Sequence, residues 1–379
     1  MPALTGIRFF AIFHVFLFHL WAVYNSNKPE GAENVLMGLA DTPPMLGVFL
    51  SNGWMSTSLF FLLSGFILAY LYWGIDGQLC MPKQRFWSLR LARIYPLHLL
   101  VLALVLFLKI PGFLEFGAPW SIIIQVSLAN LFLVHAWIPP WIPHVNWPTW
   151  TISALIFLYL IMPCLMQTLA KLSPRQLIFA LCAMPFISVL PTVVYAIAMA
   201  QGLPWNMSID SFVANTPLFW VPYFTAGMLM SRIFHLSRFE PGDPKPSWFA
   251  WGDLAFAALI ILACTPGIEQ ALKFFIRQGV LMPLYIVLVL DLARGNGLMA
   301  RVFALPGTGF LGETGFAIFM WQGVIIIGCF ISISVYPEIG PYQHWIAIMM
   351  IMVVAIPSTY LFEKPLARWL KQKYIKNVN

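Results

Sequence analysis

Charged side chains are scarce in this chain of 379 residues. Asp, Glu, Lys and Arg make up 9% of the sequence and hydrophobic residues 60%, whereas a soluble domain carries about 25% charged residues. So few charges exclude an ordinary soluble globular protein and predict a chain that lies mostly in a membrane. The net charge of +7 is then better explained by membrane topology than by nucleic-acid binding.

Metal-ligand spacing among the cysteines is also missing. The five cysteines are not clustered, and four of them lie in apolar runs. We therefore expect small buried hydrophobic side chains, no disulfide framework and no metal. A cleavable signal peptide is missing as well, because the first apolar stretch has neither a basic n-region nor a small-residue cleavage site.

Apolar stretches long enough to be helices recur along the whole chain. They lie at 5–24, 54–73, 94–112, 120–137, 150–170, 176–200, 213–232, 248–265, 272–292, 310–333 and 343–362. The expected fold is all-α, a polytopic membrane helix bundle that forms one domain over residues 1–379. We expect about ten transmembrane helices plus one short re-entrant or outer-surface helix at 120–137, a stretch that runs into three prolines.

The basic residues favour this count of ten. With both termini cytoplasmic, 16 of the 21 Lys and Arg residues fall on the cytoplasmic side, as the positive-inside rule requires. The loop at 74–93 and the C-terminal tail both belong to that side. Eleven crossings would put these two basic segments on opposite sides.

Two ionisable residues, Arg8 and His19, lie eleven positions apart in the first apolar stretch. In a helix they point within about 20° of one another and stand about 16 Å apart along the axis. A charged face inside a membrane normally turns toward a bundle interior or an aqueous cavity, so the pair is a candidate functional site. His14 lies about 140° from His19 around the helix, and we expect it to be a packed core histidine.

Seven segments in order resemble the acyltransferase-3 family of integral membrane acyltransferases. They are LTGIRFFAIFHVFLFHLW, which holds an Arg–x10–His element, SLFFLLSGFILAY (58–70), RFWSLRLARIYPLHLL, NWPTWTISALIFLYLIMP (146–163), FTAGMLMSRIF (224–234), FLGETGFAIFMWQ (310–322) and LFEKPLARWL (361–370). The resemblance covers essentially the whole chain. It implies a membrane-embedded enzyme of the bacterial inner (cytoplasmic) membrane, without a fused hydrolase-like domain.

The resemblance also implies an activity. Such enzymes move an acyl group, usually acetyl, from cytoplasmic acyl-CoA to a carbohydrate hydroxyl at or beyond the outer face. Acetyl-CoA is the expected donor, with succinyl or longer acyl groups as alternatives. The expected partners are membrane lipid, coenzyme A and a carbohydrate acceptor such as an exopolysaccharide or lipopolysaccharide unit, and not nucleic acid.

His19 is the expected catalytic residue, as the base for the acceptor hydroxyl or as a transient acyl carrier. Arg8 either holds the donor or pairs with an acid, with Asp253, Asp291 and Glu313 as candidates. Phosphate groups of coenzyme A suit the guanidinium groups of Arg85, Arg90 and Arg93. The alternative for these three arginines is a role in topology alone.

The acceptor is expected to contact Trp150, Ser153, Tyr159 and Gln322, which lie in two of the resembling segments. Both segments depart from the family pattern. Leu155 stands where the family usually has Glu, and Gln322 stands where His is common. Leucine can neither orient a histidine nor stabilise its protonated form. One alternative to an active enzyme is therefore a catalytically impaired member of the family.

A second alternative belongs to another functional class. A transporter or flippase of a lipid-linked glycan would also place Arg and His within the membrane. The sequence shows no internal repeat of the kind that many transporters carry. Binding of coenzyme A distinguishes the two classes.

Overall fold

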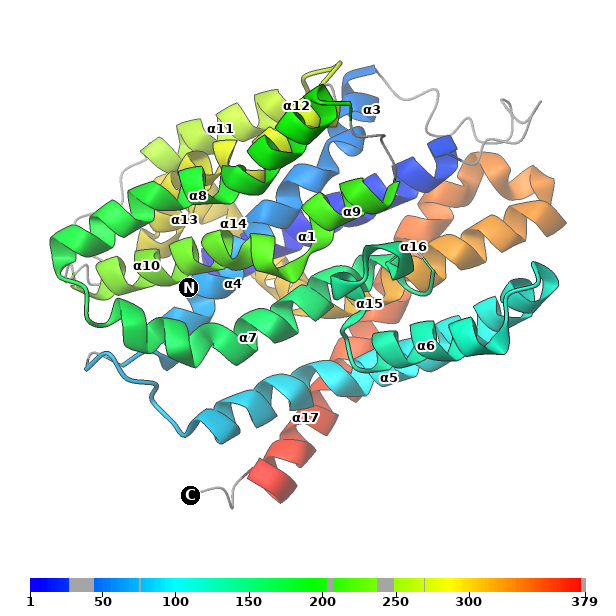
Figure 1. Cartoon of the computed structure of the whole chain (residues 1–379), viewed down its shortest axis with the longest axis horizontal. Coiled ribbons are helices and arrows are strands. Elements are labelled where there is room, and N and C mark those ends of the chain that lie inside the picture. Colours follow the sequence, from blue (N-terminus) through cyan, green and yellow to red (C-terminus); the bar gives the residue numbers. More distant parts are fainter. Residues whose placement is uncertain are drawn as a thin grey trace. The chain divides into compact units, whose positions relative to one another are not determined.

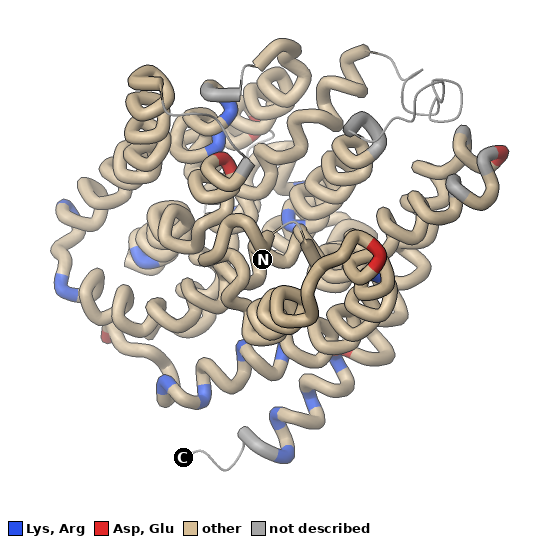
Figure 2. Tube along the Cα trace, turned by 45° about the vertical axis from the view of Figure 1, so that its right-hand side comes forward, with Lys and Arg blue, Asp and Glu red and all other residues tan. Residues whose placement is uncertain are grey.

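The structure is a computed structural model that describes residues 1–26, 44–74, 76–142, 144–202, 207–236, 249–268 and 270–375. Within these ranges it is built from helices, with no β-strand beyond one isolated bridge. Eight of the described helices are long and apolar enough to cross a membrane. The chain is therefore an all-α integral membrane protein, as predicted. Figure 2 shows how sparsely charged residues occur along the trace.

The first of two compact units comprises residues 1–80, 162–203 and 219–315. Its long helices run side by side in Figure 1. The helices of this unit, long and short, are α1 (Pro2–Ser26), α3 (Pro44–Ser51), α4 (Ser56–Tyr72), α8 (Pro174–Ala200), α10 (Val221–Leu236), α11 (Trp251–Ala263), α12 (Gln270–Phe275), α13 (Met282–Arg294) and α14 (Gly297–Phe303). The helix α10 is buried on nearly all sides and packs against α4 and α8.

Two glycines allow the close crossing of α4 and α10. A Cβ atom on Gly65 would collide with the carbonyl of Phe224, and one on Gly227 would collide with the carbonyl of Leu62. Small residues at such crossings let two helix backbones approach inside a membrane. Both glycines lie in segments that carry the family resemblance, so this part of the pattern serves packing.

The second unit comprises residues 81–161, 204–218 and 316–379. Its helices are α5 (Lys83–Glu115), α6 (Trp120–Leu131), α9 (Met207–Asn215), α16 (Gln343–Pro357) and α17 (Lys364–Leu370). In Figure 1, α5 and α6 lie side by side. Two further helices, α7 (Trp150–Leu169) and α15 (Pro306–Val335), contribute residues to both units.

The third expected span differs from the sequence-based expectation, whereas the segment after it is short, as predicted. The helix α5 begins at Lys83, so the expected basic loop is helical from that residue onward. A search for apolar stretches finds the lipid-spanning part of such a helix and misses its polar first turns. The 120–137 stretch forms the twelve-residue helix α6 and then 3₁₀ turns. A helix of that length is too short to cross a bilayer.

Three other expected spans are interrupted. The 213–232 stretch is divided between α9 and α10, with a 3₁₀ turn that starts at Pro217. A π-helical turn with a kink at Gly279 separates α12 from α13. A second π-helical turn, Ser358–Glu363, continues the last span into α17. Proline and local π geometry break helices without lowering hydrophobicity, which explains why the apolar pattern did not reveal them.

The prediction that the cysteines are free and buried is only partly correct. All five are free, but Cys80, Cys164 and Cys182 are exposed and only Cys329 is buried. The prediction of buried side chains was therefore wrong for three of them. An apolar run inside a membrane has a face that turns away from the protein, so hydrophobic surroundings in the sequence do not imply burial against other residues.

Candidate active site

The helix α1 carries Arg8 and His19 on one face. It is unbroken from Pro2 to Ser26, so the eleven steps between the two residues are all helical. Both residues are half-buried. Their directions therefore agree within about 20°, and they stand about 16 Å apart along the axis. The helical geometry assumed from the sequence is present in the structure.

The first turns of α15 pack closely on the same side of α1 as Arg8. A Cβ atom on Gly312 would collide with the carbonyl of Thr5, and one on Gly315 would lie 2.6 Å from Cδ1 of Ile12. Arg8 lies three residues after Thr5 and four before Ile12, and these spacings bring residues to one helix face. Arg8 is therefore on the face of α1 that meets α15.

Two of the acids considered for Arg8 hold backbone groups instead. The carboxylate of Asp253 accepts three backbone N–H groups at 2.8 to 3.0 Å, at the starts of α11 and α14. The carboxylate of Asp291 accepts one backbone N–H at 2.7 Å and lies 3.8 Å from Arg294. Glu313 lies one residue after Gly312 in α15 and is exposed.

His14 has different surroundings from His19. It is 4% exposed, and both ring nitrogens are hydrogen-bonded. Nδ1 lies 2.8 Å from Oγ of Ser56, and Nε2 lies 2.8 Å from the carbonyl oxygen of Phe49. These contacts fix α1 against α3 and α4. The expected packed histidine is present, away from the face that carries His19.

The arginines expected to bind the donor lie in the first three turns of α5. Arg85, Arg90 and Arg93 are all half-buried. The guanidinium carbon of Arg90 lies 6.0 Å from the ring centroid of Phe86. Nη2 of Arg93 lies 3.1 Å from Oε1 of Glu363, a buried carboxylate. Arg93 therefore already faces a protein anion, and its role includes a structural contact between α5 and the turn before α17.

The first turns of α7 are buried, and they include Trp150, Ser153 and Leu155. Oγ of Ser153 donates to the carbonyl of Leu133 at 2.5 Å. Leu133 is the one non-glycine residue with a positive φ in the described part of the chain, at 55°. This left-handed conformation costs energy in a residue with a Cβ. The hydroxyl of Ser153 thus stabilises a strained turn, a role that the sequence had not indicated.

Gln322 lies near the start of α7 within the second unit. It is fully buried, and its amide donates to a carbonyl in the preceding turn of α15 at 3.2 Å. Asn146, four residues before Trp150, donates to the carbonyl of Met320 at 3.2 Å. A Cβ atom on Gly323 would collide with Oδ1 of Asn146. The turn that leads into α7 therefore lies directly against α15 at this point.

Asn146 is a polar residue that the site prediction missed. Its side-chain oxygen is buried and has no hydrogen-bond partner in the described structure. A buried acceptor of this kind suits a hydroxyl donor from a ligand. The sequence could have indicated this residue, because it lies in the NWPTW segment. The residues predicted from that segment started only at Trp150.

Tyr159 joins α7 to α5 through its backbone. Its carbonyl accepts a hydrogen bond of 3.1 Å from Nε1 of Trp87, and the residue is half-buried. Tyr159 lies more than two turns beyond Trp150 along α7. The hydrogen bond between Trp87 and Tyr159 fixes the relative position of the two helices within the second unit.

A buried histidine lies in the turn after α6. His135 is fully buried, and its Nε2 lies 3.4 Å from the hydroxyl of Thr149. Burial, and to a smaller extent the charge of the neighbouring His98, lower the pKa of His135 to about 3. His98 is bonded at Nε2 to the carbonyl of Asn130, at 3.0 Å. His135 is thus a neutral structural histidine at physiological pH.

Within the described part of the chain, no group of three or more His, Cys, Asp or Glu residues is arranged to hold a metal ion.

Comparison with known proteins identifies the family. The family model described as an acyltransferase domain, for the acyltransferase-3 family, matches residues 1–364. Acyltransferase MdmB from Streptomyces mycarofaciens is 27% identical over 315 residues, which are 75% of this chain and 75% of that protein. No solved structure matches. The chain belongs to the acyltransferase-3 family of membrane proteins and is an acyltransferase.

Proposed function

We propose that this acyltransferase moves an acyl group, in the simplest case acetyl, from cytoplasmic acyl-CoA to a carbohydrate hydroxyl, with His19 as the catalytic base. The acceptor oxygen attacks the thioester carbonyl, its proton passes to His19, and the C–S bond breaks as the leaving thiolate of coenzyme A takes up that proton. The products are an O-acylated carbohydrate and the free thiol. The main support for this proposal is that Arg8 and His19 are half-buried and lie on one face of an unbroken helix.

His19 suits the role of base for chemical reasons. A sugar hydroxyl is a weak nucleophile at neutral pH, and a histidine takes up its proton at a pKa near the working pH. Arg8 is proposed to hold the anionic part of the donor or to position His19's helix through Glu313.

The donor is proposed to enter from the cytoplasm. Arg85 and Arg90 offer guanidinium groups for the phosphates of coenzyme A, and Arg93 combines that role with its contact to Glu363. The excess of basic residues in segments assigned to the cytoplasm supports ten spans, cytoplasmic termini and an inner-membrane location. Four described basic residues lie in α17 and the turn after it, namely Lys364, Arg368, Lys371 and Lys373, and Figure 2 shows basic positions along the trace near the C-terminus.

The acceptor is proposed to be a lipid-linked oligosaccharide or an exopolysaccharide unit. In the second unit, the buried acceptor oxygen of Asn146 and the amide of Gln322 lie at the contact between α15 and the turn before α7. Trp150 and Tyr159 follow on α7. Hydroxyl-bearing ligands use such polar groups together with aromatic surfaces.

Leu155 bears on how active this chain is. It is 3% exposed, so the position normally occupied by Glu in the family is inside the protein. Either another residue supports His19, or the chain is a weak enzyme.

Purified full-length protein in lipid nanodiscs tests the proposal. Acetyl-CoA and succinyl-CoA are supplied with lipid-linked oligosaccharide or soluble exopolysaccharide fragments. Thiol release and the acceptor mass are then measured. We expect thiol release that depends on the acceptor, and a gain of one acyl group per product. No acyl transfer and no thermal shift with coenzyme A would contradict the proposal and favour a transporter.

A further inference from the structure

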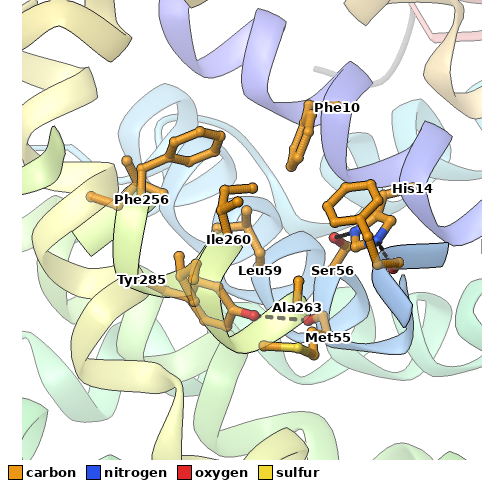
Figure 3. A pocket seen from close by; sticks show the side chains of 12 residues that line it. Phe10, His14, Met55, Ser56, Leu59, Phe256, Ile260, Ala263 and Tyr285 are labelled. Carbon is orange, nitrogen blue, oxygen red and sulfur yellow. Dashed lines mark hydrogen bonds between the residues drawn. The ribbon is translucent and has the colours of Figure 1, made fainter. Parts of the chain in front are cut away.

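The apolar pocket beside His14 is too small for a further ligand. Aromatic side chains such as Phe10 and Phe256 form part of its wall, and the hydroxyl of Ser56 faces the His14 ring on one side (Figure 3). The cavity measures about 30 Å³, which is room for about two water molecules. The hydrogen bond between Ser56 and His14 therefore serves helix packing, and the surface of the second unit offers more.

The last helical stretch of the chain is longer than the hydrocarbon core of a bilayer. From Gln343 to Lys373 it comprises 31 residues, or about 46 Å at 1.5 Å per residue. A hydrocarbon core is about 30 Å thick, and the headgroup layers extend a bilayer to about 40–45 Å. The stretch begins at Gln343, directly after the 3₁₀ turn Pro337–Tyr342. With Gln343 at one edge of the core, the other edge falls about 20 residues later, near Glu363. The turns from Lys364 onward then lie among lipid headgroups.

Three basic residues in these turns share one face of the helix. Lys364, Arg368 and Lys371 are four and three positions apart, and this spacing makes side chains neighbours on a helix. We call them the α17 stripe. Arg368 and Lys371 are exposed, and within the described part of the chain neither forms an ion pair. The stripe therefore presents positive charge to its surroundings.

The nearest acid in the sequence, Glu363, does not neutralise the stripe. Its carboxylate is buried and faces Arg93 at 3.1 Å, where the helix contacts α5. One step along a helix turns about 100°, so the stripe begins with Lys364 more than a quarter turn away from that contact. Its exposed cations point away from α5 and remain open to the headgroup layer.

Aromatic side chains accompany the basic residues at this depth. The side chain of Trp369 is 47% exposed. Nζ of Lys364 lies 4.1 Å from the ring centroid of Tyr360, and Nζ of Lys373 lies 4.7 Å from that of Trp369. Tryptophan and tyrosine gather at the level of the headgroups, and lysine stems lie along apolar surface while the ammonium group stays in the polar layer. These contacts agree with the depth that the helix length gives.

We propose that the α17 stripe binds the phosphate groups of anionic phospholipids in the leaflet at which α17 ends. A negatively charged leaflet attracts basic residues next to a transmembrane helix, by roughly fivefold in affinity for each Lys or Arg near the surface. A zwitterionic lipid carries the same phosphate together with a cation of its own, so the stripe should bind it less well. The partner is the membrane and neither the donor nor the acceptor, so this inference goes beyond the proposed function.

Native mass spectrometry of the purified full-length protein tests the proposal. The protein in neutral detergent is titrated with phosphatidylglycerol and, in parallel, with phosphatidylcholine of the same acyl chains. The lipid adducts are counted at each concentration. We expect phosphatidylglycerol to bind at least about tenfold more tightly. This preference should shrink as ammonium acetate is added, because salt screens exposed charges.

Two double variants with the same change in net charge separate the stripe from overall electrostatics. Arg368→Gln with Lys371→Gln removes two charges of the stripe, and we expect the affinity for phosphatidylglycerol to fall by roughly 25-fold. Lys171→Gln with Arg175→Gln is the matched control, because both residues are exposed and belong to the first unit. It should keep the wild-type affinity. Thermal unfolding establishes that each variant is folded.

Three results would overturn the proposal. One is equal affinity of the folded wild-type protein for the two lipids, and another is an equal loss of phosphatidylglycerol binding in both double variants. The third concerns coenzyme A, whose phosphates have similar chemistry. If the variant at Arg368 and Lys371 lost coenzyme A binding but kept phosphatidylglycerol binding, these residues would belong to the donor site.

The outcomes for this inference and for the proposed function are distinguishable. Acyl transfer by wild-type protein that shows no lipid preference would contradict the lipid surface and leave the proposed function standing. A preference for phosphatidylglycerol that depends on the α17 stripe would support the lipid surface even in a protein that transfers no acyl group.

Discussion

Arg93 and Glu363 form an ion pair of 3.1 Å that joins the first turns of α5 to the π-helical turn before α17. The carboxylate is almost fully buried, whereas 42% of the arginine side chain is exposed. A buried carboxylate needs such a partner, because an uncompensated buried charge is costly. Arg93 therefore stabilises the second unit, whether or not it also contacts the donor.

Arg90 and Arg93, three residues apart in α5, should respond differently to substitution. Arg93→Ala leaves Glu363 unpaired, so we expect a clear fall in the thermal unfolding midpoint. The cost should stay below the roughly 3–5 kcal/mol of a fully buried pair, because Arg93 is partly exposed. Arg90→Ala should leave the midpoint nearly unchanged but weaken coenzyme A binding.

A double variant serves as the control. Arg93→Ala with Glu363→Gln removes both charges and should recover part of the lost stability. Equal unfolding midpoints for Arg90→Ala and Arg93→Ala would argue against a structural ion pair. Unchanged coenzyme A affinity in Arg90→Ala would reduce Arg90 to a topology marker.

Ser153 should act through the Leu133 turn. Ser153→Ala removes the donor to a buried carbonyl, which costs about 1–3 kcal/mol when the group stays unsatisfied. The measurement is the shift in thermal unfolding midpoint. Ser127→Ala is the control, because Oγ of Ser127 bonds to a carbonyl within its own helix, at 2.7 Å. A smaller shift for Ser153→Ala than for Ser127→Ala would contradict the proposed structural role.

His135 makes stability depend on pH. Its pKa of about 3 in the folded protein lies below the value near 6.5 of an exposed histidine. Above pH 6.5 both states are neutral and the residue contributes no pH dependence. As the pH falls from 6.5 toward 3, the unfolded chain takes up a proton and the folded protein does not. Stability is therefore lost at about 1.4 kcal/mol per pH unit.

The measurement is the unfolding midpoint at pH 7 and pH 5, in wild-type protein and in His135→Gln. The wild type should lose about 2 kcal/mol more than the variant over this interval. His144→Gln, at an exposed position, should behave like the wild type. The same pH dependence in His135→Gln would show that other groups cause it.

Leu155→Glu tests the departure from the family pattern. If the missing carboxylate limits this chain, the variant should increase acyl transfer, and the increase should disappear in the presence of His19→Ala. Leu155→Gln is the control, because it adds polarity without charge. Lost expression or unchanged activity in Leu155→Glu would indicate that this enzyme has rebuilt its site without the acid.

The sequence predicted the helical membrane fold well, because a lipid-facing helix needs a long apolar run and because Arg8 and His19 follow helical spacing. The breaks at Pro217 and at Gly279 were missed, since they leave the hydrophobic pattern unchanged. The ion pair of Arg93 with Glu363 and the contact of Asn146 with α15 were also missed. Both join residues more than 170 positions apart, and a single sequence carries no signal for such pairings.

The histidines show the same limit at the site. Helical periodicity separated His14 from His19 correctly. It could not show that His14 meets Ser56 and Phe49, because those partners come from other helices. Helical periodicity also could not reveal that the hydroxyl of Ser153 donates a hydrogen bond to the carbonyl of Leu133 in the strained turn.

The most direct test of the central claim is acyl transfer by purified His19→Ala, with His144→Ala as the control for loss of a histidine. Both variants are compared with wild-type protein for thiol release with acceptor, for thermal unfolding, and for the thermal shift caused by coenzyme A. We expect His19→Ala to keep its fold and its coenzyme A binding but to lose transfer by at least about 10²-fold, while His144→Ala stays active. A folded His19→Ala that retains more than about a tenth of wild-type turnover would contradict the role of His19 as the base.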